Sequence, residues 1–375
     1  MAAGSLFGGS SFRHWHLAWF AGCRGVFGPV PQPLLMNACG KVRASPGVES
    51  KHSKPPVLPA TRRIYTPPVS LPGATYDHGD FTAPVLAALK AAQGTCISVC
   101  LPARDEAETV GPIVAAIHRA LVERVPLVDE IVVVDDDSSD GTGAVAAAAG
   151  ARVVRASDIL PDCGPGAGKG NVLWKSLYAC EGDLLCWLDA DIRGFAPHFV
   201  TGLLGPLLNR GDTAFVKSFY RRPGEHGDGG RVTELVARPL LSQLFPHLTG
   251  FVQPLSGEYA GRREVLDDLP FVEGWGVELG LLVDVVARRG LASVAQVDLG
   301  ERRHRNRPLA DLGPQAMAVL VTALRRAGLD HTTAPDLVRY GDDHRPQRVP
   351  VEARERPPMR TVPAYRAKFR GELSA

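Results

Sequence analysis

The chain has 375 residues, of which 45% are hydrophobic and 22% charged, and its formal net charge at pH 7 is +2. This length allows one large domain or two, and the composition is that of an ordinary globular protein. The balanced charge gives no indication of nucleic-acid binding, and no apolar run approaches the ~18 residues of a membrane span. The seven cysteines form no CxxC pair, which argues against a zinc site or disulfide framework and favours a reducing, cytoplasmic compartment.

The first 75 residues lack the periodic patterns of helices and strands. Residues 40–73 are rich in Pro, Lys, Arg and Ser, which is typical of an unstructured segment. Two interpretations remain open for residues 1–75: a disordered extension, or a start codon assigned too far upstream. We expect the folded part to begin near Tyr76.

From Tyr76 to residue 191, short apolar strands alternate with segments of helical periodicity. Strands are expected at 95–103, 128–135, 152–156 and 183–191, and helices at 108–122, 143–151 and 168–180. Strands that alternate with helices predict a mostly parallel α/β sheet.

The pattern becomes less regular after residue 191. A polar, Gly-rich loop is expected at 222–231, helices at 232–247, 279–289 and 314–328, and a strand at 293–299. From residue 340 onward the chain is rich in Pro and Arg without clear periodicity. We interpret it as a tail, or as an arm that embraces a second subunit.

Polar residues follow three of the predicted strands. Pro102 and Ala103 end the first, Asp136 lies in the acidic run after the second, and Asp189 and Asp191 end the fourth. Ligands of open α/β sheets bind at the carboxyl ends of the strands, so these residues should converge on one crevice. Two carboxylates one residue apart suit a hard cation such as Mg²⁺. The alternative is a solvated strand end, and turn and cap chemistry for the acidic run.

Three basic segments could bind anions. Lys169 lies on a Gly-rich turn at a helix start, where amides and ammonium suit a phosphate, although Gly170 excludes a Walker motif. The run "GERRHRNR" at 300–307 follows a strand, so some of its arginines should face the crevice, and His304 could be a metal ligand. The stretch "GGRVTE" offers a second anion site, although basic runs are more often plain surface.

Several motifs resemble those of nucleotide-sugar glycosyltransferases with the GT-A fold. They are "LPARDEAETVGPIV", "VVVDDDSSDGT" and "WLDADI". A closer resemblance, over roughly residues 75–325, is to the actinobacterial glucosyl-3-phosphoglycerate synthases. It rests on "GKGNVLWKSL", "FVKSFYRRP", "GRVTELVARPLL", "QPLSGEYAGRRE", "GWGVELGLLVD" and "ERRHRNRPL".

The resemblance implies a GT-A fold, that is, a Rossmann-like α/β sheet with a nucleotide-sugar half at 76–195 and an acceptor half at 196–330, followed by the tail at 331–375. It implies a retaining transfer of glucose from UDP-glucose to 3-phosphoglycerate by a homodimer. The expected cofactor is Mg²⁺, or Mn²⁺ or another divalent cation in its place.

The resemblance also implies roles for individual residues. The expected donor-binding residues are Pro102, Ala103, Glu106, Asp136, Lys169 and Asp189. The expected acceptor-binding residues are Gly230, Arg231, Thr233, Arg302 and Asn306. Asp191 and His304 would hold the metal. At the reacting centre, the carbonyl of Leu255 would face the sugar and Glu278 would orient its hydroxyls, unless Glu278 only neutralises a helix start.

The chain departs from the family pattern at four positions. Ala190 replaces a Ser between the two acids, at a position that is not expected to bind the metal. Asp136 replaces another Ser, and its extra carboxylate could alter the contacts to the base or ribose, so a nucleotide other than UDP stays open. Asp105 replaces an Asn, and Trp275 replaces a Tyr near the sugar.

Other functions stay open. One is a mannosyl-3-phosphoglycerate synthase, because glucose and mannose differ at one hydroxyl and the deciding contacts lie in the loops at 250–278. Another is a GT-A enzyme with a different acceptor, including an inverting enzyme that acts on a lipid. The last is a nucleotide-sugar sensor without turnover.

Overall fold

A computed structural model describes residues 71–222, 230–303, 308–329, 336–341 and 343–371. The predicted N-terminal segment lies outside this part, except for residues 71–75. The first strand begins at Ala74, two residues before the expected start of the fold. His304 and Asn306 also lie outside the described residues.

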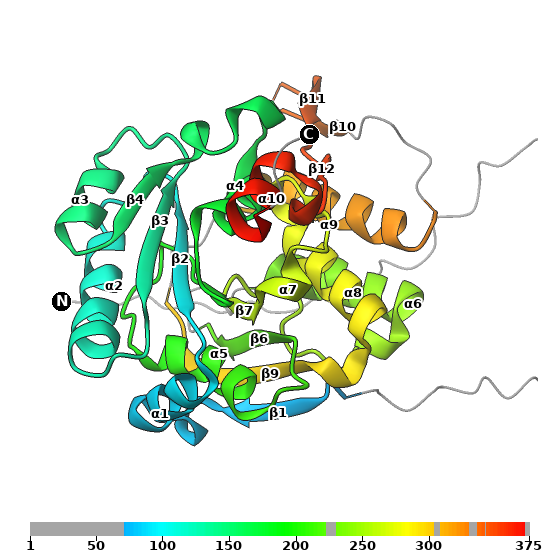
Figure 1. Cartoon of the computed structure of the whole chain (residues 1–375). Coiled ribbons are helices and arrows are strands. Elements are labelled where there is room, and N and C mark those ends of the chain that lie inside the picture. The colour runs from blue at the N-terminus through cyan, green and yellow to red at the C-terminus, as the bar shows by residue number, and fades with distance from the viewer. Residues whose placement is uncertain (1–70, 223–229, 304–307, 330–335, 342, 372–375) are drawn as a thin grey trace, which may run out of the picture. The chain divides into compact units, whose positions relative to one another are not determined.

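An eight-stranded sheet forms the centre of the fold, in the order β1-β9-β6-β7-β5-β2-β3-β4 (Figure 1). Its strands are β1 (Ala74–Asp77), β2 (Ile97–Ala103), β3 (Glu130–Asp135), β4 (Arg152–Arg155), β5 (Leu184–Trp187), β6 (Phe215–Arg221), β7 (Tyr259–Arg262) and β9 (Val294–Glu301). Only β7 runs antiparallel to its neighbours, β5 and β6. The prediction of a mostly parallel α/β sheet is therefore confirmed.

Helices cover both faces of this sheet. One face carries α1 (Ala83–Gln93), α2 (Val110–Ile117), α3 (Thr142–Ala148) and α5 (His198–Asn209). The other carries α4 (Gly168–Ala179), α6 (Arg238–Leu244), α8 (Val277–Arg289) and α9 (Leu312–Arg326). The short α7 (Arg263–Leu266) follows β7. None of the helices in the described ranges is long and apolar enough to cross a membrane.

The central strands are mostly hydrophobic because both of their faces are buried. In β3, Ile131 and Val133 pack into the core beneath α2, whereas Val132 and Val134 pack into the core beneath α4. The sequence pattern did not reveal α1, α5, β6 or β7. In those four segments the spacing of the apolar residues does not distinguish a helix from a buried strand.

The predicted C-terminal tail folds back onto this core. It contains a hairpin of β10 (Asp336–Tyr340) and β11 (Pro346–Pro350), then β12 (Glu355–Arg356) and α10 (Pro363–Arg370). Strand β12 pairs with β8 (Phe271–Val272). Figure 1 shows α10, in red, beside α4, and its Tyr365 is 1% exposed. The segment from 355 to 370 is therefore part of the folded core. Its contacts are with residues distant in sequence, so they produce no periodic pattern of apolar residues in the segment itself.

Candidate active site

A pocket of about 510 Å³ opens at the carboxyl ends of β2, β3 and β5. The convergence expected from the strand ends is therefore confirmed. Every predicted site residue that the structure describes lines this pocket: Pro102, Ala103, Glu106, Asp136, Lys169, Asp189, Asp191, Gly230, Arg231, Thr233, Leu255, Glu278 and Arg302.

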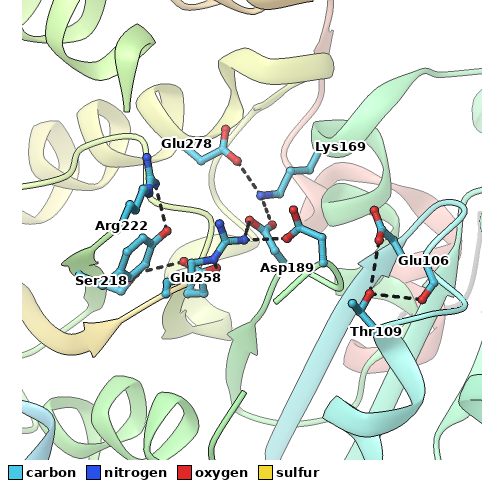
Figure 2. Close-up of polar contacts among 11 residues, drawn as sticks. Glu106, Thr109, Lys169, Asp189, Ser218, Arg222, Glu258 and Glu278 are labelled. Atoms are coloured by element: carbon cyan, nitrogen blue, oxygen red, sulfur yellow. Dashed lines mark hydrogen bonds and ion pairs between the residues drawn. The ribbon is translucent and has the colours of Figure 1, made fainter. Parts of the chain in front are cut away.

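Lys169 joins two acidic side chains that come from distant parts of the chain. Its Nζ lies 2.5 Å from Oδ1 of Asp189, after β5, and 2.8 Å from Oε1 of Glu278, in the first turn of α8 (Figure 2). The side chains of Lys169 and Glu278 are 11% and 7% exposed. Glu278 is thus an ion-pair partner at the pocket wall and does more than neutralise a helix start.

Arg302, at the end of β9, bridges the two acids of the Asp-Ala-Asp motif. Its Nη2 lies 2.9 Å from Oδ2 of Asp189 and 2.7 Å from Oδ1 of Asp191. Its Nε lies 2.7 Å from Oε1 of Glu258, a carboxylate that is fully buried behind the pocket. Arg302 is itself 4% exposed, so these charges are held in a low-dielectric environment where they interact strongly.

The pKa values of the acids reflect this arrangement. Burial raises the pKa of Asp189, but Lys169 and Arg302 outweigh it and lower the pKa to about 2. Burial raises the pKa of Glu258, although Arg302 opposes the shift. The pKa of Lys169 is raised, because Asp189 and Glu278 overcome the effect of burial. The pocket therefore keeps Asp189 ionised and Lys169 protonated at neutral pH.

The loops after β2 and β3 form one wall of the pocket. Within the acidic run, the Ser138 amide donates to Oδ1 of Asp135 and the Thr142 amide donates to Oδ1 of Asp140, each at 3.0 Å. The acidic run thus performs the turn chemistry that was one of its two interpretations, while Asp136 lines the pocket. Burial raises the pKa of Asp136, and Arg104 opposes that shift.

A second wall is formed by the start of the segment that leads into α6. Gly230 and Arg231 precede a short π-helical segment, Thr233–Ala237, and Thr233 is 5% exposed. Arg222 lies on the same pocket and its Nη2 donates to the Tyr220 hydroxyl at 3.1 Å. Two arginines that line one pocket suit an acceptor with anionic oxygens.

Two buried residues that support this site were not among the predicted ones. One is Glu258, described above. The other is Lys217 of β6, which is 1% exposed and donates from Nζ to the carbonyl of Ser256 at 2.7 Å. Lys217 also lies over the ring of Tyr259, 4.5 Å from its centre. A charged residue inside the otherwise apolar strand "FVKSFY" was the signal that could have revealed it.

The buried position of Lys217 predicts a pH-dependent stability. Burial lowers its pKa to about 7, against the partial opposition of Glu278. An unfolded lysine titrates near ~10.4, so between these values the unfolded state binds more protons and rising pH favours the fold. From pH 7 to 10, the unfolding free energy of the wild type should therefore rise relative to that of Lys217→Met in urea denaturation. An equal pH dependence in both proteins would contradict this assignment.

Of the two predicted metal residues, Asp191 is the one within the described part of the chain. No group of three or more His, Cys, Asp or Glu side chains within the described ranges could hold a metal. Asp191 lines the pocket and uses Oδ1 for Arg302, whereas His304 lies outside those ranges. Mg²⁺ is commonly bound by one or two carboxylates together with substrate phosphates. Asp191 fits such a shared cation.

Fold and site together define a nucleotide-sugar glycosyltransferase of the GT-A type. Residues 98–269 match the family model "Glycosyl transferase family 2". The glucosyl-3-phosphoglycerate synthase of Mycolicibacterium smegmatis is 46% identical over 297 residues, 77% of this chain and 96% of that protein. The one from Petrotoga mobilis is 44% identical, over 76% of this chain and 93% of the relative. The chain belongs to the family of glucosyl-3-phosphoglycerate synthases.

Two solved structures have the same fold. Glucosyl-3-phosphoglycerate synthase from Mycobacterium tuberculosis, in complex with Mn²⁺, UDP and glucosyl-3-phosphoglycerate, has a TM-score of 0.71 at 45% identity. The match covers 77% of this chain and 99% of that one. Mannosyl-3-phosphoglycerate synthase from Rubrobacter xylanophilus has a TM-score of 0.71 at 41% identity, over 77% and 97% of the two chains.

Proposed function

We propose that this protein transfers glucose from UDP-glucose to 3-phosphoglycerate, with retention of the anomeric configuration, and releases UDP. The observation that carries this proposal is that a single pocket is lined by both predicted groups of residues. The donor group centres on Lys169 and Asp189, and the acceptor group on Arg231 and Thr233. The M. tuberculosis relative was solved with Mn²⁺, UDP-glucose and phosphoglyceric acid, which are the ligands this division would accommodate.

The proposed chemistry breaks the bond between the anomeric carbon and the diphosphate, and forms a bond to the hydroxyl of the glycerate. Lys169 neutralises the negative charge that develops on the leaving diphosphate. A divalent cation held by Asp191, with His304 as its further ligand, would supply Lewis-acid stabilisation of the same charge. The hydroxyl proton passes to the leaving phosphate oxygen, which agrees with the lack of an assigned general base in the donor cluster.

The sugar contacts are assigned to Glu278, beside Lys169, and to Leu255. Glu278 accepts hydrogen bonds from glucose hydroxyls, and the carbonyl of Leu255 faces the reacting carbon. Both residues line the pocket, as does Trp275. Pro102, Ala103 and Glu106 contact the nucleoside, and Asp136 lies near the ribose or uracil. Arg302, with Asn306, completes the acceptor site.

A mannosyl transfer is the second candidate, and the 41% identity to the mannosyl-3-phosphoglycerate synthase favours keeping it. Product formation should be measured with purified protein, Mg²⁺ and 3-phosphoglycerate against UDP-, GDP- and ADP-glucose and GDP-mannose. Glucosyl-3-phosphoglycerate from UDP-glucose would support the proposal, and its anomeric configuration by NMR would test retention. Product from GDP-mannose alone would replace it with the mannosyl reaction. Binding of donor and metal without release of free nucleotide would indicate a sensor.

Arg231→Met should raise the KM for 3-phosphoglycerate by about 10- to 100-fold, because it removes a charge-assisted hydrogen bond worth about 1.5–3 kcal/mol. The affinity for UDP, measured by calorimetry, should stay unchanged, since Arg231 is assigned to the acceptor alone. Arg119→Met, on the exposed surface of the other helical layer, is the matched control. A selective loss of UDP affinity would reassign Arg231 to the donor.

We also propose a cytoplasmic homodimer. The described cysteines, among them the buried Cys100, Cys180 and Cys186, are free thiols, which agrees with a reducing compartment. The dimer rests on the family resemblance. Light scattering after size exclusion should give twice the 40.1 kDa mass of the chain, and a monomeric mass would reject it.

A further inference from the structure

The segment from Glu352 to Pro358, here called the C-terminal strap, crosses the back of the wall that carries Lys169. The strap contains β12, which pairs with β8 so that Arg356 lies opposite Phe271. The Glu273 amide also donates to the Arg354 carbonyl at 2.7 Å. Figure 1 shows β12 and α10 close to α4, the helix on whose first turn Lys169 lies.

Arg356 connects two parts of the pocket wall that are more than a hundred residues apart in sequence. Its Nε lies 2.8 Å from Oε1 of Glu273, which is 2% exposed, and 3.0 Å from Oδ1 of Asn171 in α4. Its Nη1 and Nη2 donate to the carbonyls of Cys163 and Gly164 at 2.8 and 3.1 Å.

Close packing explains two glycines near Lys169, namely Gly166 before it and Gly170 after it. A Cβ on Gly166 would lie 2.0 Å from Nη2 of Arg356, and a Cβ on Gly170 would lie 1.8 Å from the carbonyl of Val272. No larger residue fits at either position without displacing the guanidinium or the backbone of β8. The turn is therefore shaped by close packing against the strap and β8, in addition to any phosphate it binds.

The two segments that carry Lys169 and Glu278, here called the two arms of the ion pair, both begin next to Arg356. Lys169 follows the turn whose carbonyls Arg356 holds, and Glu278 follows the loop that starts at Glu273. The amide of Gly274 donates to the Ala167 carbonyl at 3.2 Å, which joins the two arms directly. A change in the relative position of the arms would alter where the Lys169 ammonium lies.

We propose that Arg356 is a positioning residue for the donor site. Through Glu273 and the carbonyls of Cys163 and Gly164, it fixes the glycine-rich turn against the loop before α8, and thereby sets Lys169 opposite Glu278. Arg356 does not line the pocket, so it acts through these residues and not on the substrate. The kinetic part of this inference rests on the proposed function, whereas the structural part does not.

The test compares three variants. Arg356→Met/Glu273→Met removes both members of the buried pair, so that neither charge is left without a partner. Arg356→Lys keeps the charge but not the planar fork that reaches two carbonyls. Arg354→Met is the matched control, because Arg354 lies in the same strap and contacts Glu273 at 3.2 Å, but is 65% exposed.

The first readout is hydrogen exchange of the amides between residues 163 and 171, which needs no substrate. Exchange should accelerate in the double variant, to a lesser degree in Arg356→Lys, and not in Arg354→Met. The second readout is steady-state kinetics well below the melting temperature. The double variant should lose about 10- to 100-fold in kcat/KM for the sugar nucleotide, while the KM for 3-phosphoglycerate stays unchanged.

Unchanged exchange across the turn in a folded double variant would overturn the proposal. So would a loss of activity that only follows the loss of folded protein, or one that affects both substrates equally, since either would make Arg356 purely structural. If the wild type shows no glucosyl transfer, the proposed function fails, but the exchange result still decides whether the strap fixes the turn.

Discussion

Asp191→Asn is expected to lower kcat for glucosyl transfer by at least about 10³-fold at saturating Mg²⁺. Asn preserves the size of the side chain, and its carbonyl oxygen can still accept the hydrogen bond that Arg302 donates at 2.7 Å. It removes the negative charge that a divalent cation needs. A loss of about 4 kcal/mol of transition-state stabilisation corresponds to this factor.

The effect on metal binding can be measured without turnover. In the presence of UDP, calorimetric titration with Mn²⁺ should show binding to the wild type and greatly weakened binding to Asp191→Asn. Asp158→Asn, an exposed acid outside the pocket, should behave as the wild type in both measurements. Full metal-dependent activity in Asp191→Asn would remove Asp191 from the metal site.

Lys169→Met should damage both stability and catalysis. Without the ammonium, Glu278 is left as a buried carboxylate that has lost its cation, and Asp189 keeps only Arg302. Breaking a buried ion pair in this way costs about 3–5 kcal/mol of unfolding free energy. The loss of one preorganised charge beside the leaving diphosphate should lower kcat by about 10²- to 10³-fold.

A double-mutant cycle separates these two effects. Adding Glu278→Gln to Lys169→Met removes the uncompensated charge, so urea denaturation should show that much of the stability returns. Activity should not return, because neither the ammonium nor the sugar contact is restored. If the double variant regained activity together with stability, Lys169 would serve only to neutralise Glu278.

The site residues that lie in short sequence motifs could be predicted. Residues at the ends of parallel strands must meet at one edge of the sheet, so Pro102, Asp136 and Asp189 could be placed together before their geometry was known. Lys169 could be placed near them, because a glycine-rich helix start suggests a phosphate site. The motif resemblance then extended the site to Arg231 and Glu278, and the pocket includes both.

The supporting residues could not be predicted, because their partners are distant in sequence. Nothing near Glu258 indicates that it will be fully buried beside Arg302, and nothing near Arg356 indicates that it will reach Gly164. An Arg-rich segment without periodicity predicts a solvated tail. Only the structure shows that Arg356 in this segment neutralises the buried Glu273. Charge pairing over long distances leaves no periodicity for a sequence pattern to detect.

The antiparallel strand β7 of the eight-stranded sheet has a consequence for how the molecule folds. Because β7 lies between β5 and β6, the segments before and after residue 195 share one continuous sheet. A fragment that ended near residue 195 would expose the edge of β5, whose four residues are all buried in the full chain. Such an unprotected apolar edge favours aggregation. We therefore expect the segments before and after residue 195 to fold together, and a module swap at that point to require a matching change in β7.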